Sequence, residues 1–406
     1  MNIVSVSWGD HLVFGEADGR LETEEAVARR MRAWRDELGA TALHWRALRE
    51  RIPGRFSSGR GYRHPSLTAA RSLGWDDFAV VPALAHDAGL EAWLYVTLFD
   101  EGWPLPPPRV RAVSYHNAMH GRHVAWQSDL TRAHPEWVVV DRSGRRRQWG
   151  VVSCAYPAAR RAFIRRWLAL LAPTRFDGLF VCLRSQSRPA DQADQFGHNR
   201  PVRAAFRERY GIDPGIRDFD RQAWRDLCGE SLTTLLAELR EALAVHGRTL
   251  GIGVARGDVL GPPLGNTTLC WREWVRRGLI DQFVVGQNSS QCPSMWHQLW
   301  PMHRGTGYVQ NYLDGTGLPP LAAHLRDAYG PAIGGTATRL YVARQWHPRC
   351  TAEERELGAI PGVAGLVFSS FRHDNPNAIA RGDWTAGRVR GSGLRRRPVS
   401  AGPRVY

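Results

Sequence analysis

Short apolar runs alternate with longer amphipathic stretches along most of the chain. The runs are rich in β-branched and aromatic residues and are bounded by Gly, Asp or other polar residues, which is the pattern of buried strands. Eight of them predict strands, at residues 2–8, 41–46, 90–99, 177–183, 249–255, 279–287, 339–346 and 365–371. A further run at 307–313 predicts an additional extended piece.

The stretches between these runs predict helices. Residues 22–38 (ETEEAVARRMRAWRDEL) open with acidic side chains, which suit the positive end of a helix dipole. Helices are also expected near 75–89, at 157–173 and at 221–247, where Gly247 would end the longest of them. Regular alternation of eight strands with helices predicts the α/β class and a (β/α)8 TIM barrel.

Long insertions interrupt this regular pattern after two of the strands. The segment 100–150 is far longer than an ordinary connection and is rich in His, Trp and Arg, and the polar stretch 185–202 follows the fourth strand. Long connections inside a compact domain are usually functional, so we expect insertion 100–150 to form part of the active-site face. We expect a catalytic barrel over residues 1–375 and an irregular Arg/Gly/Pro-rich tail over 376–406.

The charge of the chain gives little information about partners. The formal net charge of +15 would suit a nucleic-acid partner, but all 54 basic residues are Arg and they are scattered apart from two triplets. A nucleic-acid binder more often shows a basic stripe or a recognisable module. Arg enrichment without Lys indicates a compositional bias of the source genome. We therefore expect a bacterial protein with no nucleic-acid partner.

Cysteine usage and the N-terminal sequence indicate a reduced, cytoplasmic protein. The six Cys form no C-x-x-C pair and no ligand spacing with His, so neither a zinc site nor a disulfide framework is predicted, and Cys182 is expected in the core. The chain enters an apolar strand at Ile3 without a basic leader, and no run approaches membrane-spanning length. We predict no cofactor and no membrane partner.

The active site of a (β/α)8 barrel lies at the carboxyl-terminal ends of its strands. The polar residues that follow the predicted strands are Asp10, Arg46, Asp100, Arg184, Asp258, Gln287, Asn288, Gln345, His373 and Asp374, and the insertion adds Arg111, Tyr115 and His116. A metal site at His116, His120 and His123 would need a helix, and Gly121 argues against one, so no metal is predicted.

Each of these residues also has an ordinary structural interpretation. Asp10 could cap a helix, although the next predicted helix begins well downstream, and a loop residue such as His116 is more often a surface hydrogen-bonding group. Arg184, at the end of the fourth strand, could form an ion pair with a neighbouring acid. Its functional interpretation is more specific, because a guanidinium is a bidentate partner for a carboxylate. A sugar that carries its own carboxylate would need such a residue.

The order and spacing of these residues resemble a known family. The barrel, the Asp-Gly strand and the motif F-x-x-R-Y-G-I-D (Phe206 to Asp213) resemble the family-10-type glycosyl hydrolase-like barrels. Asp10 after the first strand, Arg111 with His116 five residues later, and Arg184 ending the fourth strand resemble the exo-sialidases of glycoside hydrolase family 156. The resemblance covers about residues 1–375.

The resemblance implies an inverting exo-sialidase with Asp10 and His116 as catalytic residues and Arg111 and Arg184 holding the substrate carboxylate. It also implies an Asn from a late loop, for which we choose Asn311 over Asn288. Tyr115 and Gln345 are further substrate-binding candidates, and Tyr115 as nucleophile would instead make the enzyme retaining. The propeller sialidases are excluded, because the chain has no repeated S-x-D-x-G-x-x-W box.

Other functions fit the same sequence. A hydrolase for a different acidic sugar would need a carboxylate pair, for example Asp100 or Asp258 with Asp10. A carbohydrate-binding pseudoenzyme is a third possibility and a nucleic-acid binder a fourth. A sialylated glycan or small sialoside is the expected partner. Whether the chain forms a homodimer is left open by the sequence. The assignment of acid and base and the preferred linkage and sialic-acid variant are also open.

Overall fold

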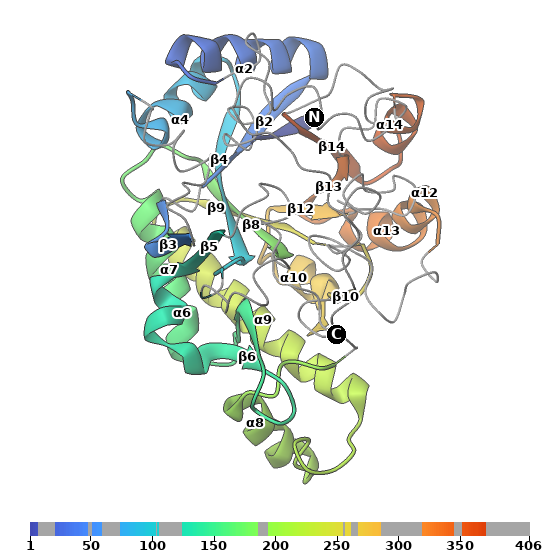
Figure 1. Ribbon diagram of the computed structural model, residues 1–406. Helices are drawn as coiled ribbons and strands as arrows, with labels where there is room; N and C mark the ends of the chain where they lie inside the picture. The colour runs from blue at the N-terminus through green and yellow to red at the C-terminus, as the bar shows by residue number, and fades with distance from the viewer. Residues whose placement is uncertain are drawn as a thin grey trace, which may run out of the picture.

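The computed structural model describes residues 1–6, 21–47, 51–58, 74–102, 104, 124–185, 194–254, 256–260, 267–285, 319–344 and 351–370. In these ranges eight parallel strands close into a barrel in the order β1-β14-β13-β12-β9-β8-β4-β2 (Figure 1). They are β1 (Asn2–Val6), β2 (Ala40–Arg46), β4 (Glu91–Phe99), β8 (Gly178–Ser185), β9 (Thr249–Gly253), β12 (Gln282–Val285), β13 (Arg339–Arg344) and β14 (Val363–Ser369). Each corresponds to one of the eight predicted strands, which confirms the (β/α)8 fold.

Side chains alternate between the inside of the barrel and the surrounding helices. The inner set consists of Ile3, Ala42, Trp93, Tyr95, Phe180, Cys182, Val284, Tyr341, Ala343 and Val367. The alternate residues of the same strands pack in a larger cluster under the helices. Both faces are therefore apolar, which is why the strands read as nearly continuous apolar runs in the sequence. Cys182 is fully buried in the inner set, as predicted.

Helices surround the barrel in Figure 1. They are α2 (Glu24–Leu38), α4 (Asp77–Asp87), α7 (Pro157–Leu171), α9 (Arg221–Ala244), α10 (Trp271–Arg276), α12 (Leu321–His324), the π-helical turn η6 (Leu325–Tyr329), α13 (Gly330–Ile333) and α14 (Thr351–Gly358). Local capping sets several of their ends: the Thr23 hydroxyl accepts a hydrogen bond from the amide of Ala26, and Gly39 ends α2 with φ 59°. The four predicted helices are confirmed with small shifts in their ends.

The described part of the long segment between β4 and α7 contributes strands to two small antiparallel sheets. β3 (Gly54–Ser58) pairs with β5 (Val124–Ser128), and β6 (Val138–Val140) pairs with β7 (Arg147–Val152). The short α6 (Asp129–Ala133) and the 3-10 turn η4 (Pro135–Trp137) lie between them. The β3–β5 pair holds the connection after β2 against the connection after β4. Another small pair, β10 (Val259–Leu260) with β11 (Thr267–Thr268), follows β9.

A second aromatic core supports the region after β8. Helix α8 (Arg200–Tyr210) packs Val202 and Phe206 against residues of the following loop and α9, and it projects at the bottom of the view in Figure 1. Buried Asp194 accepts two hydrogen bonds from the Arg225 guanidinium, at 2.9 and 2.5 Å. Asp213, the last residue of the predicted F-x-x-R-Y-G-I-D motif, is bound by Arg203 at 2.8–3.0 Å. The motif therefore stabilises the end of α8.

Strand-opening polar side chains join neighbouring strands at the amino-terminal end of the barrel. Asp177 accepts a hydrogen bond from the amide of Ala92 at 2.7 Å, and Asp281 accepts one from the amide of Leu250 at 2.8 Å. Asn2 does the same for the amide of Leu366 at 3.0 Å. A Cβ on Gly178 would lie 2.5 Å from the Thr249 hydroxyl and 2.7 Å from the Trp93 ring, so barrel packing requires a glycine at the start of β8.

The described helices include none with both the length and the apolar character needed to cross a membrane.

Candidate active site at the carboxyl-terminal end of the barrel

Most of the predicted site residues lie outside the described residues. These are Asp10, Arg111, Tyr115, His116, Asn288, Asn311 and Gln345, and the same holds for Gln287, His373, Asp374 and the tail 376–406. Arg184 is the exception, because its backbone belongs to β8, two positions after Cys182. The described part of the site therefore consists of the residues that follow β2, β4 and β9 at the carboxyl-terminal end of the barrel.

Arg46 is the most informative described residue at this end. It is the last residue of β2 and follows Ala42 and His44 on the face that points into the barrel. Its guanidinium carbon lies 5.6 Å from the centre of the Tyr95 ring, and Tyr95 belongs to the inner set. The side chain is 17% exposed. A cation thus lies where the barrel interior meets solvent.

The end of β4 provides two carboxylates with different roles. Glu101 is fully buried and accepts hydrogen bonds from both terminal nitrogens of Arg166, at 2.9 and 2.5 Å. Its backbone also bonds to Gly150 and Ser128, so it anchors the insertion to the barrel. Asp100, 7% exposed, has an oxygen 3.9 Å from Arg46 Nη2. Asp100 therefore contributes negative charge next to Arg46, whereas Glu101 is structural.

The connection after β9 is held by structural contacts. Asp258 accepts hydrogen bonds from Trp271 Nε1 at 2.6 Å and Arg272 at 2.9 Å, and its side chain is 54% exposed. The amide of Gly257 donates to the Tyr329 hydroxyl at 2.8 Å, and burial raises the pKa of Tyr329 above its ordinary value. Asp258 is thus a half-exposed carboxylate bound by side chains of α10, which argues against a catalytic role for it.

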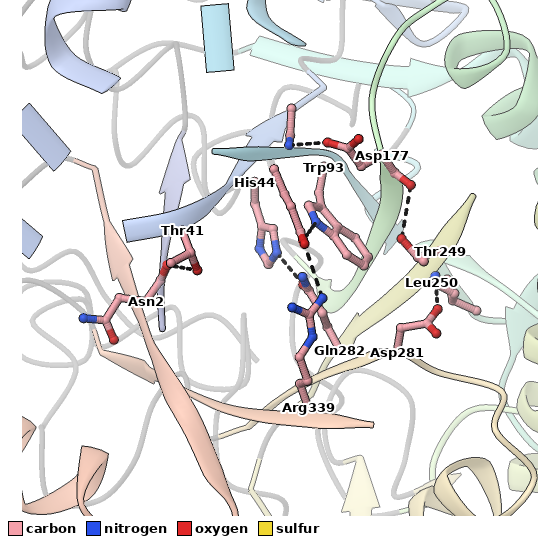
Figure 2. Close-up of polar contacts among 12 residues, drawn as sticks. Asn2, Thr41, His44, Trp93, Asp177, Thr249, Leu250, Asp281, Gln282 and Arg339 are labelled. Carbon is pink, nitrogen blue, oxygen red and sulfur yellow. Dashed lines mark hydrogen bonds and ion pairs between the residues drawn. The ribbon is translucent and has the colours of Figure 1, made fainter. Parts of the chain in front are cut away.

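Below the level of Arg46, the barrel interior contains a polar pair that the sequence pattern did not identify. His44 Nε2 lies 2.9 Å from Gln282 Oε1, and Figure 2 shows the two side chains pointing toward each other. The His44 ring stacks on Phe180 with centroids 4.0 Å apart. Since the Gln282 oxygen only accepts, His44 Nε2 carries the proton. Burial lowers the pKa of His44 to about 4, so the ring is neutral.

The opposite end of the barrel also contains an arginine. Arg339 at the start of β13 lies 3.5 Å from Glu91 Oε2, which accepts a hydrogen bond from Trp93 Nε1 at 3.0 Å. Arg339 is the register partner of Gln282 on the neighbouring strand β12, and Figure 2 shows it close to Gln282. Because barrel enzymes carry their chemistry at the carboxyl-terminal end, we assign this group to stability.

Metal-binding geometry is not seen in the described ranges, where no three His, Cys, Asp or Glu side chains gather around one point. Two described thiols are unsuited to nucleophilic chemistry. Burial raises the pKa of Cys154 and of Cys228 to about 12, so both are protonated at neutral pH.

Comparison with known proteins gives structural likeness only. No protein-family model and no curated protein matches the chain. A β-galactosidase from the psychrophilic Marinomonas ef1 is similar over 97% of this chain and 60% of its own, with 13% identity and a TM-score of 0.49. α-L-Fucosidase isoenzyme 2 from Paenibacillus thiaminolyticus is similar over 97% of this chain and 49% of its own, with 12% identity and a TM-score of 0.45.

A Group IV chitinase from Ostrinia furnacalis is similar over 71% of this chain and 50% of its own, with 15% identity and a TM-score of 0.34. The chain thus spans about half of the length of these larger proteins. Likeness at this level carries no conclusion about activity, and the assignment of the barrel depends on the strand order and register described above.

Proposed function

We propose that the chain is a glycoside hydrolase that removes terminal sialic acid, or a related nonulosonic acid, with inversion at the anomeric carbon. The observation that carries the proposal is the Arg46 guanidinium at the carboxyl-terminal end of the barrel, together with the position of Arg184 in β8. Hydrolases of neutral sugars flank the glycosidic bond with two carboxylates. At the described strand ends, Glu101 is bound by Arg166, Asp258 is bound at the surface, and Asp100 lies beside Arg46.

The substrate explains why arginines would replace acids here. A sialic acid carries a carboxylate on its anomeric carbon, and its hydrolysis passes through an oxocarbenium-like transition state. Guanidinium groups from Arg111 and Arg184 would bind that carboxylate bidentately and fix the sugar ring. Asn311, Asn288, Tyr115 and Gln345 are the proposed remaining contacts.

Inversion needs one group that activates water and one that protonates the leaving oxygen, about 6.5–9.5 Å apart on opposite faces of the sugar. Asp10 and His116 are the proposed pair. An imidazole with an unperturbed pKa of about 6.5 serves either role near neutral pH. The pH profiles of kcat for His116→Gln and Asp10→Asn would assign acid and base, because each variant should lose the limb that reports the group it lacks.

The test is proton NMR of the protein with a simple α-sialoside, recorded from the first minutes. We expect β-sialic acid to be the first product and activity to fall by at least about a hundredfold in Asp10→Asn and in His116→Gln, since general acid–base catalysis contributes roughly 10²–10⁴-fold. The α-anomer appearing first would show retention and would move the nucleophile to Tyr115. Absence of any release would refute sialidase activity.

A second function, hydrolysis of a glycoside of another acidic sugar, is favoured by Asp100 at the end of β4. Its side chain is largely buried and lies beside Arg46, so one carboxylate and one guanidinium occur together. This alternative predicts release from an aryl glucuronide or galacturonide and loss of that release in Asp100→Asn. Sialoside cleavage that survives Asp100→Asn would instead favour the first function.

A further inference from the structure

We propose that Arg46 is a substrate-binding residue that pairs with the carboxylate of an acidic sugar, in addition to the arginines assigned above. This inference depends on the proposed function, because it concerns the same end of the barrel. It requires a guanidinium that faces the substrate, is reachable from solvent, and is not already consumed by a structural ion pair. The described residues meet these requirements.

The first requirement is met by strand register. Side chains of one parity along a strand share one face, and the β2 residues of Arg46's parity are Ala42 and His44. Ala42 belongs to the inner set, and His44 is stacked on Phe180 inside the barrel. Arg46 continues this inner face by one step toward the carboxyl-terminal end, where active sites of such barrels lie.

The second requirement concerns its surroundings. The guanidinium lies over the Tyr95 ring, which holds a cation without occupying its N–H donors. Deeper in the barrel, the His44–Gln282 pair is neutral, because burial lowers the pKa of His44 to about 4. With a 17% exposed side chain, Arg46 is reachable from solvent yet partly shielded, so an ion pair there is stronger than one on the open surface.

The third requirement is met when Arg46 is compared with three other partly buried arginines of the described ranges. Arg166 is bound to Glu101 at 2.5–2.9 Å, Arg225 to Asp194 at 2.5–2.9 Å and Arg160 to Glu238 at 2.8–2.9 Å, each through two nitrogens. Such bidentate pairs are the usual state of a buried arginine. Within the described ranges, the ion-pair contact of Arg46 is the 3.9 Å approach to Asp100, which is too long for a hydrogen bond.

The carboxylate of a sugar would give Arg46 the bidentate acceptor that Asp100, at 3.9 Å, does not provide. A planar carboxylate accepts two parallel hydrogen bonds from one guanidinium, whereas a neutral hydroxyl cannot neutralise the charge. Asp100 then helps to orient the guanidinium and limits the local positive charge around Arg46. Arg46 therefore selects the ligand by charge, which makes a carboxylate-to-ester change in the ligand the decisive probe.

The experiment measures binding by isothermal titration calorimetry with N-acetylneuraminic acid and its methyl ester, and with glucuronic acid and its methyl ester. We expect Arg46→Gln to weaken binding of the acid by about 10- to 100-fold, the usual range for one charge-assisted hydrogen-bond partner, and to leave ester binding within about twofold. Arg46→Lys should give an intermediate loss for the acid alone. The matched control is Arg339→Gln, which removes an interior arginine from the opposite end of the barrel.

The outcomes separate this inference from the proposed function. Equal losses for acid and ester, or no loss in either Arg46 variant, would overturn the role of Arg46 even if sialosides are cleaved. Binding of glucuronic acid but not of N-acetylneuraminic acid would refute the sialidase proposal. The role of Arg46 would then stand if the loss is again confined to the acid. Failure of the wild-type protein to bind either acid would overturn both. Melting temperatures of the variants identify any loss of folding.

Discussion

At the residue scale, His44 is a titratable group that lies out of contact with water. It is fully buried, stacked on Phe180, and bonded to a residue 238 positions away in the sequence. Within the described part of the chain, neither His44 Nδ1 nor Gln282 Nε2 has a hydrogen-bond partner. A barrel interior usually places aliphatic side chains at such positions. The pair therefore makes the barrel sensitive to protonation.

Folding stability should fall with acidification because of His44. Burial lowers its pKa from 6.5 to about 4, so below pH 6.5 the unfolded chain takes up a proton that the folded protein does not. The free energy of unfolding is then lost progressively as pH falls from about 7 toward 4, by up to about 3 kcal/mol from this residue. Urea unfolding of wild type and His44→Met across this range should show a shallower slope in the variant.

The control for this prediction is His246→Gln, which changes an exposed histidine and should leave the slope of stability against pH intact. His198, 3% exposed and stacked on Trp224, also has its pKa lowered to about 4 by burial and should keep part of the slope in His44→Met. Identical slopes in wild type and His44→Met would contradict a neutral buried His44.

At the scale of elements, the barrel strands are joined by side chains at their starts as well as by their backbone ladders. Asp281 accepts from the amide of Leu250 and also pairs with Arg240 of α9, so one carboxylate ties β12, β9 and a helix together. Asp177 joins the amide of Ala92 to His86 of α4 in the same way. In the sequence these acids have the pattern of turn residues, but in the structure they hold neighbouring strands and helices together.

Removing one of these acids should destabilise the protein without affecting ligand binding at the other end of the barrel. We expect Asp281→Ala to cost about 1–3 kcal/mol, because it leaves the amide of Leu250 and the Arg240 guanidinium without their acceptor. Asp281→Asn should cost less, since the amide oxygen still accepts. Chemical denaturation measures both. Asp218→Ala, at a side chain that is 98% exposed, is the control and should have no measurable effect.

At the scale of the whole molecule, the barrel closes by pairing its first strand with its last. β1 pairs with β14 through Ile3–Val367, Val4–Phe368 and Ser5–Ser369. Gly365 lies in this seam, where a Cβ would be 1.3 Å from the carbonyl oxygen of Met1. The close approach of the two backbones is possible because residue 365 has no side chain. Closure and global stability are therefore coupled at this seam.

Gly365→Ala should lower the stability of the whole barrel by about 2–4 kcal/mol, because backbone atoms must move to admit the methyl group. The control is Gly358→Ala in α14, where an added Cβ meets no atom within 4 Å. That substitution should be neutral or stabilise by up to about 1 kcal/mol. Thermal unfolding measures both variants, and equal melting temperatures would show that the seam tolerates a side chain.

The strands and helices of this protein were readable from the sequence because their signals are local. Apolar runs bounded by Asp-Gly, acidic helix starts such as Glu24 and stops such as Gly247 act within a few residues, so the eight barrel strands and the four helices are predicted close to their observed bounds. Arg46 was recognised as a strand-end residue for the same reason. The roles of Asp10, Arg111, His116 and the other residues outside the described ranges remain predictions from sequence.

Only the tertiary structure decided which of these polar residues meet. His44 and Gln282 lie on strands far apart in sequence, and their contact depends on the register of the closed barrel. Glu101 is bound by Arg166 whereas its neighbour Asp100 lies beside Arg46, and these partners come from elements far apart in the sequence. A local pattern fixes which face a side chain occupies, whereas strand order and register fix what lies opposite it, because those depend on packing over the whole barrel.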